Sequence, residues 1–235
     1  MTPNMKVRTL LYAALVTALG ACGGGVEMPA ESVSAGHISS DVPVEVDASA
    51  HYLIYLHGRI IEDQGVRPTH PVFGVYEYRE ILEDFAGRGF DVISEARPAG
   101  TDVGAYAAHV VKQVEILLAA GVPPEHITVV GFSKGGGIAI LTSSLLADDR
   151  VNFVFMGACG PGYASRPEIV PRGRLLGLRE ATDDLAGPCD QLFARAPPAD
   201  ERAEVVLELG GGHGAFYRPH PEWVEPVVRW ALASG

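Results

Sequence analysis

One serine in this chain lies between glycines in a pattern that can make it a nucleophile. The stretch Gly131-Phe132-Ser133-Lys134-Gly135 fits G-x-S-x-G. A β-branched apolar run, 127–130, precedes it, and a stretch of small and apolar residues, 136–146, follows it. This context predicts a sharp strand-to-helix turn, which needs glycines because it leaves no room for a Cβ beside the serine. Ser133 would stand at a helix N-terminus, where developing negative charge is favoured. The alternative is a glycine-rich turn with an incidental serine.

A serine nucleophile needs a base, and the base needs an acid that orients it. His213 lies in the glycine-rich stretch 210–214, directly after a predicted strand at 204–209. Another predicted strand, 174–179, runs into a group of carboxylates. Residues that directly follow parallel strands gather at the carboxyl edge of the sheet. The pattern therefore predicts that the serine, a histidine and an acid meet at that edge.

Three carboxylates after the strand at 174–179 are candidates for the acid: Glu180, Asp183 and Asp184. Glu180 is still close to the strand, where the pleat of the sheet would fix its side chain. Asp183 and Asp184 lie in the turn, and adjacent residues there point in different directions. Only one of the two can therefore reach His213.

Strands and helices alternate after residue 51, which is typical of a mostly parallel sheet with helices on both faces. About six strands are expected, at 52–56, 90–94, 127–131, 151–156, 174–179 and 204–209. Helices are expected at 76–88, 103–120, 135–146 and 224–232, with Pro226 in the first turn of the last one. Trp223 and Trp230 are expected to be packing residues.

The first 21 residues are predicted to be a signal peptide rather than part of the fold. Lys6 and Arg8 precede an apolar run, 10–19, that is too short to span a bilayer. The run ends in Leu19-Gly20-Ala21-Cys22, which resembles a bacterial lipobox, so Cys22 would become the lipidated first residue of the mature protein. An ordinary secretory signal with an unmodified Cys22 is the alternative.

The predicted organisation is therefore a signal peptide at 1–21, a flexible tether at 22–50 and one folded domain at 51–235. The tether is rich in Gly, Ser, Ala, Pro and acids, and a short strand at 42–46 is possible within it.

Loss of Lys6 and Arg8 would change the formal net charge from −11 to −13, which argues against nucleic acid and anionic lipid as partners. Membrane association would come from acyl chains on Cys22. Since Gly23 and not Asp follows the cysteine, the outer membrane is the expected destination in a Gram-negative cell.

From about His51 to its end, the chain resembles a small serine hydrolase of the α/β-hydrolase family. The resemblance depends on the turn around Ser133, on His57-Gly58 after an early strand, on the acid after a late strand and on His213 between glycines. The order serine, acid, histidine is that of this family. Two departures are that no antiparallel strands are evident before His51 and that no insertion is long enough for a lid.

The resemblance implies that Ser133 is the nucleophile, His213 the general base and Asp183 the acid. Asp183 is favoured over Asp184 because family members with a pattern like Thr182-Asp183-Asp184 pair the first acid with the histidine. No cofactor is implied, and no His/Cys cluster has the spacing of a metal site.

The resemblance also implies an oxyanion hole made of backbone N–H groups. One donor would be Lys134 and the other Gly58 or Arg59, with His57 shaping the loop and the Lys134 side chain not required. Two roles remain for Arg59 and Arg97: contact with a substrate carboxylate, or ion pairs with nearby acids. Two roles also remain for Phe216 and Tyr217: they would either line a substrate pocket or pack within the fold.

Cys159 and Cys189 remain after Cys22 is assigned to lipid. Export would place them in an oxidising compartment, where we expect a disulfide between them. Two buried free thiols are the alternative.

The function expected from these residues is hydrolysis of carboxylic esters or thioesters through an acyl-enzyme, at the cell envelope. The absence of an evident lid favours small or soluble esters. A small serine peptidase would use the same residues, and a non-catalytic lipoprotein with this fold is the remaining alternative.

Overall fold

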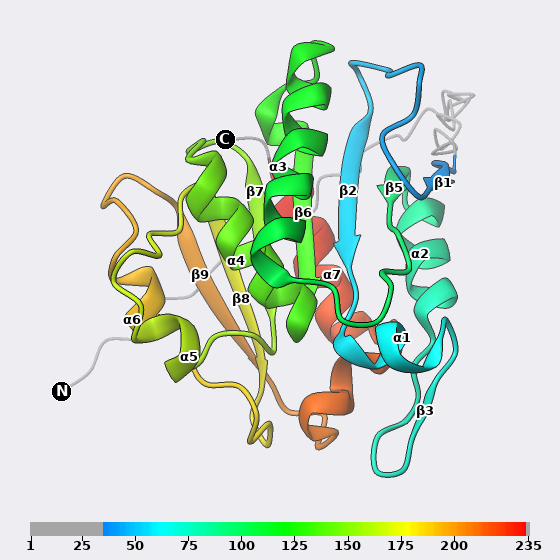
Figure 1. The fold of residues 1–235 in the computed structure, drawn as a ribbon, viewed down its shortest axis with the longest axis vertical. Coiled ribbons are helices and arrows are strands. Elements are labelled where there is room, and N and C mark those ends of the chain that lie inside the picture. The colour runs from blue at the N-terminus through cyan, green and yellow to red at the C-terminus, as the bar shows by residue number, and fades with distance from the viewer. Residues whose placement is uncertain (1–34, 234–235) are drawn as a thin grey trace, which may run out of the picture. The chain divides into compact units, whose positions relative to one another are not determined.

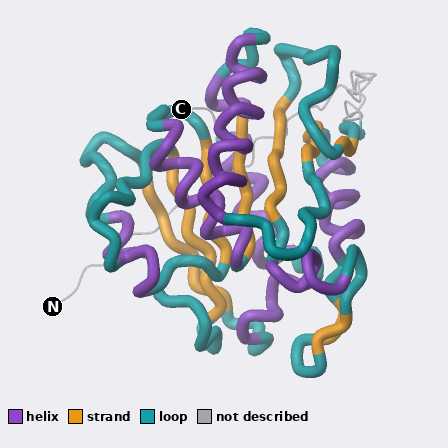
Figure 2. Tube along the Cα trace, viewed as in Figure 1, coloured by secondary structure: helices purple, strands orange, loops and turns teal. Residues whose placement is uncertain are grey.

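A parallel sheet of seven strands forms the centre of the computed structural model, which describes residues 35–233 (Figures 1 and 2). The strand order is β1-β5-β2-β6-β7-β8-β9. The strands are β1 (Ile38–Ser39), β2 (His51–Leu56), β5 (Phe90–Ile93), β6 (Ile127–Phe132), β7 (Asn152–Met156), β8 (Arg174–Glu180) and β9 (Arg202–Leu207). The remaining strands, β3 (Thr69–His70) and β4 (Gly74–Val75), form a separate antiparallel hairpin.

Helices cover both faces of the sheet, as the alternation of elements predicts. They are α1 (Arg59–Gln64), α2 (Tyr78–Gly87), α3 (Val103–Ala119), α4 (Lys134–Leu146), α5 (Pro161–Ala164), α6 (Asp190–Phe193) and α7 (Pro221–Leu232), with 3-10 turns η1 (Pro124–His126) and η2 (Gly212–Tyr217). Figure 1 shows α3 and α4 in front of the sheet and α7 behind it. Two hydrophobic cores result, one between the sheet and α3, α4 and α6, the other between the sheet and α2 and α7.

Strand β2, inside the sheet between β5 and β6, shows how the sequence builds both cores. Tyr52, Ile54 and Leu56 belong to the core beneath α3 and α4, whereas Leu53 and Tyr55 belong to the core beneath α2 and α7. Successive side chains of a strand point to opposite faces, so a strand covered on both sides must be apolar throughout.

The connections diverge between β2 and β6, which are neighbours in the sheet. The chain leaves β2 toward β5 on one side and leaves β6 toward β7 on the other. Such a switch point opens a crevice at the carboxyl ends of the strands, where ligands of α/β folds bind. Ser133 follows β6 and Gly58 follows β2, so both lie at this point.

The tether predicted over 22–50 is wrong for residues 35–50, which belong to the folded domain. β1 pairs with β5, the His37 N–H donates to Asp91 Oδ1 over 2.8 Å, and Val42 and Val46 pack against the core. The short strand lies at 38–39 and not at 42–46. The sequence does not locate it, because a two-residue strand is too short to show a periodic pattern. Residues 1–34, with the predicted signal peptide and Cys22, lie outside the described residues.

The last helix also begins earlier than predicted. α7 starts at Pro221 with His220 as its N-cap, so Pro226 lies inside the helix and not in its first turn. Pro221 suits the first helical position because its missing N–H would have no partner there. Among residues 35–233, no helix is both long and apolar enough to cross a membrane.

Candidate active site

Ser133 occupies a strained turn between β6 and α4. Its backbone has φ 54° and ψ −117°, in the region of positive φ that residues with a Cβ rarely adopt. The flanking glycines make the turn possible. A Cβ at Gly131 would lie 2.2 Å from the Gly135 carbonyl oxygen, and one at Gly135 would lie 1.9 Å from the Leu56 carbonyl oxygen.

Ser133, His213 and Asp183 form a continuous chain of hydrogen bonds. The Ser133 Oγ lies 2.8 Å from His213 Nε2, and His213 Nδ1 lies 2.8 Å from Asp183 Oδ2. Since Asp183 accepts from Nδ1–H, the neutral imidazole leaves Nε2 free to accept the serine proton. The acid follows β8 and the histidine follows β9, and these strands are neighbours in the sheet.

Asp183 is fixed by more than the imidazole. Its second oxygen, Oδ1, accepts from the N–H groups of Leu185 at 2.9 Å and Ala186 at 3.3 Å. Burial raises the pKa of Asp183, but the His213 hydrogen bond and these amides outweigh burial and hold the pKa below its ordinary value. Asp184 is exposed on the same loop, so of the two candidates only Asp183 meets His213.

Glu180, the third candidate acid, is fully buried and has a different place. Its Oε2 accepts from the N–H and hydroxyl of Thr182, and its Oε1 accepts from the Gly210 N–H over 2.9 Å. The Thr182 hydroxyl oxygen in turn accepts from the Gly212 N–H over 3.2 Å. Glu180 therefore joins the loop of Asp183 to the loop of His213, a role that its position at the end of a strand did not reveal.

The loop after β7 lies directly against Asp183 and His213. Gly157 has φ 52°, and a Cβ there would lie 3.2 Å from Asp183 Oδ2 and 3.3 Å from His213 Cε1. Two residues later, a disulfide joins Cys159 to Cys189, and both cysteines are buried. The bond connects the loop after β7 to the segment that continues from Asp183.

Two helix N-termini lie beside Ser133. Arg59 is the first residue of α1 and Lys134 the first of α4, so neither N–H has an acceptor within its helix. The Gly58 N–H instead faces Tyr76 Oη at 3.5 Å. A Cβ at Gly58 would lie 3.6 Å from the Ser133 Cβ, which places this loop against the serine. Of the three predicted donors, Arg59 and Lys134 therefore stand at helix N-termini, whereas the Gly58 N–H faces Tyr76.

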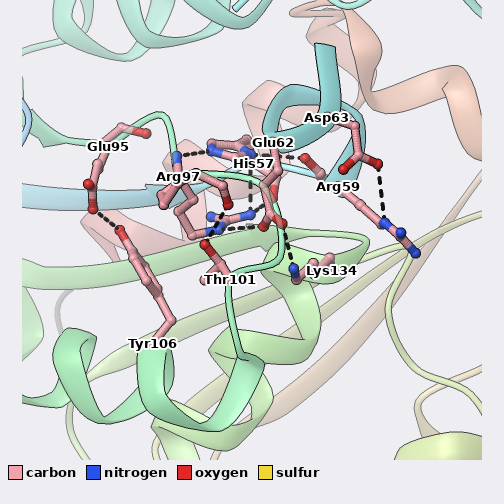
Figure 3. Close-up of polar contacts among 12 residues, drawn as sticks. His57, Arg59, Glu62, Asp63, Glu95, Arg97, Thr101, Tyr106 and Lys134 are labelled. Carbon is pink, nitrogen blue, oxygen red and sulfur yellow. Dashed lines mark hydrogen bonds and ion pairs between the residues drawn. The ribbon is translucent and has the colours of Figure 1, made fainter. Parts of the chain in front are cut away.

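A cluster of polar side chains lies next to these N-termini (Figure 3). We call it the Glu62 cluster, and it consists of His57, Glu62, Arg97 and Lys134. Glu62 Oε1 accepts from Arg97 Nε over 3.0 Å, and Glu62 Oε2 accepts from Lys134 Nζ over 2.5 Å. Arg97 therefore has the ion pair that was one of its two expected roles. The other predicted arginine, Arg59, pairs with Asp63 at the surface.

His57 completes the cluster as a neutral side chain. Its Nε2 accepts from the Arg97 backbone N–H over 2.9 Å, and its Nδ1 lies 2.9 Å from the Gly58 carbonyl oxygen. Burial, followed by the Arg97 charge, lowers the pKa of His57 to about 3. This agrees with a residue that shapes the loop rather than with a second base.

The aromatic residues near His213 pack within the core. Phe216 and Tyr217 are buried, and Tyr217 stacks on Tyr76 with ring centroids 4.7 Å apart. Trp223 is fully buried, and Trp230 lies beneath the Arg174 guanidinium at 5.0 Å. Within the part of the chain that the structure describes, no group of three His, Cys, Asp or Glu residues could hold a metal ion.

Comparisons with known proteins agree with this architecture. No family model and no curated protein matches the sequence. Among solved structures, the chain is similar to a putative dienelactone hydrolase from Klebsiella pneumoniae, with TM-score 0.53 and 15% identity over 81% of this chain and 90% of that one. It is also similar to a structure reported for the metagenome-derived lipolytic enzymes LipS and LipT, with TM-score 0.52 and 12% identity over 85% of this chain and 95% of that one. The seven-stranded sheet, its helical layers and these similarities show that the chain has the α/β-hydrolase fold.

Proposed function

We propose that this protein is a serine hydrolase that cleaves carboxylic esters or thioesters through an acyl-enzyme. The observation that carries the proposal is the hydrogen-bonded chain from Ser133 through His213 to Asp183, at 2.8 Å for each link. A serine whose proton can pass to an oriented imidazole is the requirement for this chemistry.

The reaction follows from these positions. The Ser133 Oγ attacks the carbonyl carbon as its proton moves to His213 Nε2, and Asp183 stabilises the imidazolium. The Arg59 and Lys134 N–H groups receive the oxyanion, and each such donor contributes roughly 3 kcal/mol to the transition state. His213 then returns the proton to the leaving alkoxide or thiolate. A water molecule activated by the same imidazole attacks the acyl-enzyme and releases the acid.

Ester substrates are favoured over amides by the neighbours in structure. One is described as a putative dienelactone hydrolase, and the other belongs to lipolytic enzymes placed among lipases and esterases. Within residues 35–233, the connections at the carboxyl edge include only the small hairpin β3–β4 and short helical turns, with no separate lid. We therefore propose small or soluble esters as substrates.

The test is labelling of Ser133 by a fluorophosphonate and hydrolysis of p-nitrophenyl esters of graded acyl length. Ser133→Ala should fold, lose the label and lose about six orders of magnitude in turnover. Ser49→Ala, which changes an exposed serine in the loop before β2, serves as the matched control and should keep both. Activity of Ser133→Ala within tenfold of the wild type would refute the assignment.

We further propose that lipid on Cys22 anchors the protein to the bacterial envelope, on the outer-membrane side. The support is the Leu19-Gly20-Ala21-Cys22 sequence at the end of the apolar run. Cys22→Ser should abolish labelling by fatty acid and leave either uncleaved precursor or a soluble form. Unchanged labelling and unchanged membrane fractionation would refute the anchor.

A further inference from the structure

Glu62 connects the two helices whose N-termini lie beside Ser133. It lies on α1, one turn after Arg59, and its side chain is 1% exposed. Its Oε2 accepts from Lys134 Nζ over 2.5 Å, and Lys134 is the first residue of α4. One carboxylate thus joins the element that carries one proposed oxyanion donor to the element that carries the other.

The place of Lys134 shows that this contact is more than a surface ion pair. A cation at a helix N-terminus is opposed by the helix dipole, whose positive end lies there. The Lys134 side chain is nevertheless only 17% exposed and turns toward α1 to reach Glu62. The carboxylate offsets the unfavourable charge and at the same time draws α4 toward α1.

Arg97 holds the same carboxylate from the opposite side. Its side chain is fully buried, and its Nε donates to Glu62 Oε1 over 3.0 Å. Its terminal amino group also donates to the His57 carbonyl oxygen, and its backbone N–H donates to His57 Nε2 over 2.9 Å. The residue after His57 is Gly58, the N-cap of α1, so Arg97 fixes both the start of α1 and the carboxylate one turn later.

We propose that Glu62 is a positioning residue for the hydrolysis, which sets the spacing of the Arg59 and Lys134 N–H donors through its two ion pairs. The inference rests on the proposed function and adds a residue to it. An interaction that holds these donors where negative charge develops stabilises the transition state more than the neutral substrate.

The first test is Glu62→Gln, which keeps the shape of the side chain but cannot hold both cations. Turnover, kcat, should fall about 10- to 100-fold, less than the loss of a whole oxyanion donor, while KM changes by less than about threefold. Affinity for a boronic acid, which forms a tetrahedral adduct with Ser133, should fall in parallel with kcat. Asp63→Asn is the matched control, because it removes one negative charge from the next residue of α1 but at the surface.

The second test is Lys134→Met, which keeps the Glu62–Arg97 pair and every backbone N–H. It decides the question if Glu62→Gln fails to fold. It should reproduce the loss of kcat without a comparable change in KM, and Lys134→Arg should restore part of it. The double variant Glu62→Gln/Lys134→Met should lose little more than either single variant, because both act through one contact.

Wild-type kcat in Lys134→Met, or a loss confined to KM, would overturn the inference. The same holds if Asp63→Asn lowers kcat as much as Glu62→Gln. If the wild-type protein neither hydrolyses esters nor reacts with a fluorophosphonate at Ser133, the proposed function fails and the inference fails with it. An active wild type with fully active variants refutes the inference alone.

Discussion

Two buried carboxylates, Glu180 and Glu62, support opposite sides of the candidate site by different means. Glu180 accepts from backbone N–H groups and a hydroxyl in the loops of Asp183 and His213. Glu62 accepts from two cations, Arg97 and Lys134, which lie 35 and 72 residues further along the chain.

The difference has an energetic meaning. Where neutral donors hold a carboxylate, each buried donor left unpaired lowers the free energy of unfolding by about 1–3 kcal/mol. A buried ion pair costs more to break, about 3–5 kcal/mol, because the remaining charge has no compensation. The free energy of unfolding should therefore fall gradually when single donors to Glu180 are lost, and sharply when the charge of Glu62 or of one of its partners is changed.

The strongest test of the acid–base side is the choice between its two adjacent acids. Asp183→Asn should lower turnover by about 10⁴, because the imidazole then takes the wrong tautomer. Asp184→Asn is the matched control and should stay within a few-fold of the wild type, since its side chain is exposed. Steady-state kinetics on one ester decides the matter, and the reverse pattern would move the acid to Asp184.

The two sides should also lose their contributions to folding stability at different pH values. His57 is neutral in the fold, with its pKa lowered to about 3 from an ordinary 6.5, so the unfolded chain binds its proton first as the pH falls. The contribution of His57 alone should lower the free energy of unfolding below pH 6.5 by about 1.4 kcal/mol per pH unit, to roughly 4 kcal/mol near pH 3. The pKa of Asp183 is lowered from 3.8, so its contribution is lost only below about pH 4.

Urea denaturation at pH 7.5 and pH 4.5 measures this effect. The difference in unfolding free energy between the two pH values should shrink by roughly 2–3 kcal/mol in His57→Gln. His37→Gln, which removes an imidazole that is 94% exposed, is the control for loss of a histidine at the surface. Equal pH dependence of His57→Gln and the wild type would contradict a buried neutral His57.

A smaller effect is expected for Glu180→Gln. The amide can accept at one end only, so a donor in the Asp183 or His213 loop loses its partner. Turnover should fall less than tenfold, and the free energy of unfolding should fall by about 1–3 kcal/mol. Glu208→Gln, an exposed change of the same kind near the same loop, should have neither effect. A loss as large as that of Glu62→Gln would remove the contrast between the two sides.

The sequence predicts the two sides unequally, and the reason is physical. Ser133, His213 and the acids each follow a strand directly, so strand periodicity and the glycines locate them at one edge of the sheet. The two partners of Glu62 come from separate connections, one after β5 and one after β6, and no periodicity links them. Glu180 shows the same limit in a milder form, because the sequence locates the end of the strand but does not indicate the direction of this side chain. The segment 35–50 was missed because β1 has only two residues.

The backbone of Ser133 carries a further consequence, for the relation between stability and selection. At φ 54° and ψ −117° a glycine would be under less strain than any residue with a Cβ. Ser133→Gly should therefore be more stable than Ser133→Ala, by about 1 kcal/mol, although both lack the hydroxyl. A thermodynamic preference for glycine at a site occupied by serine would mean that selection has kept a less stable chain. This comparison would reveal a functional constraint on Ser133 before any substrate is known.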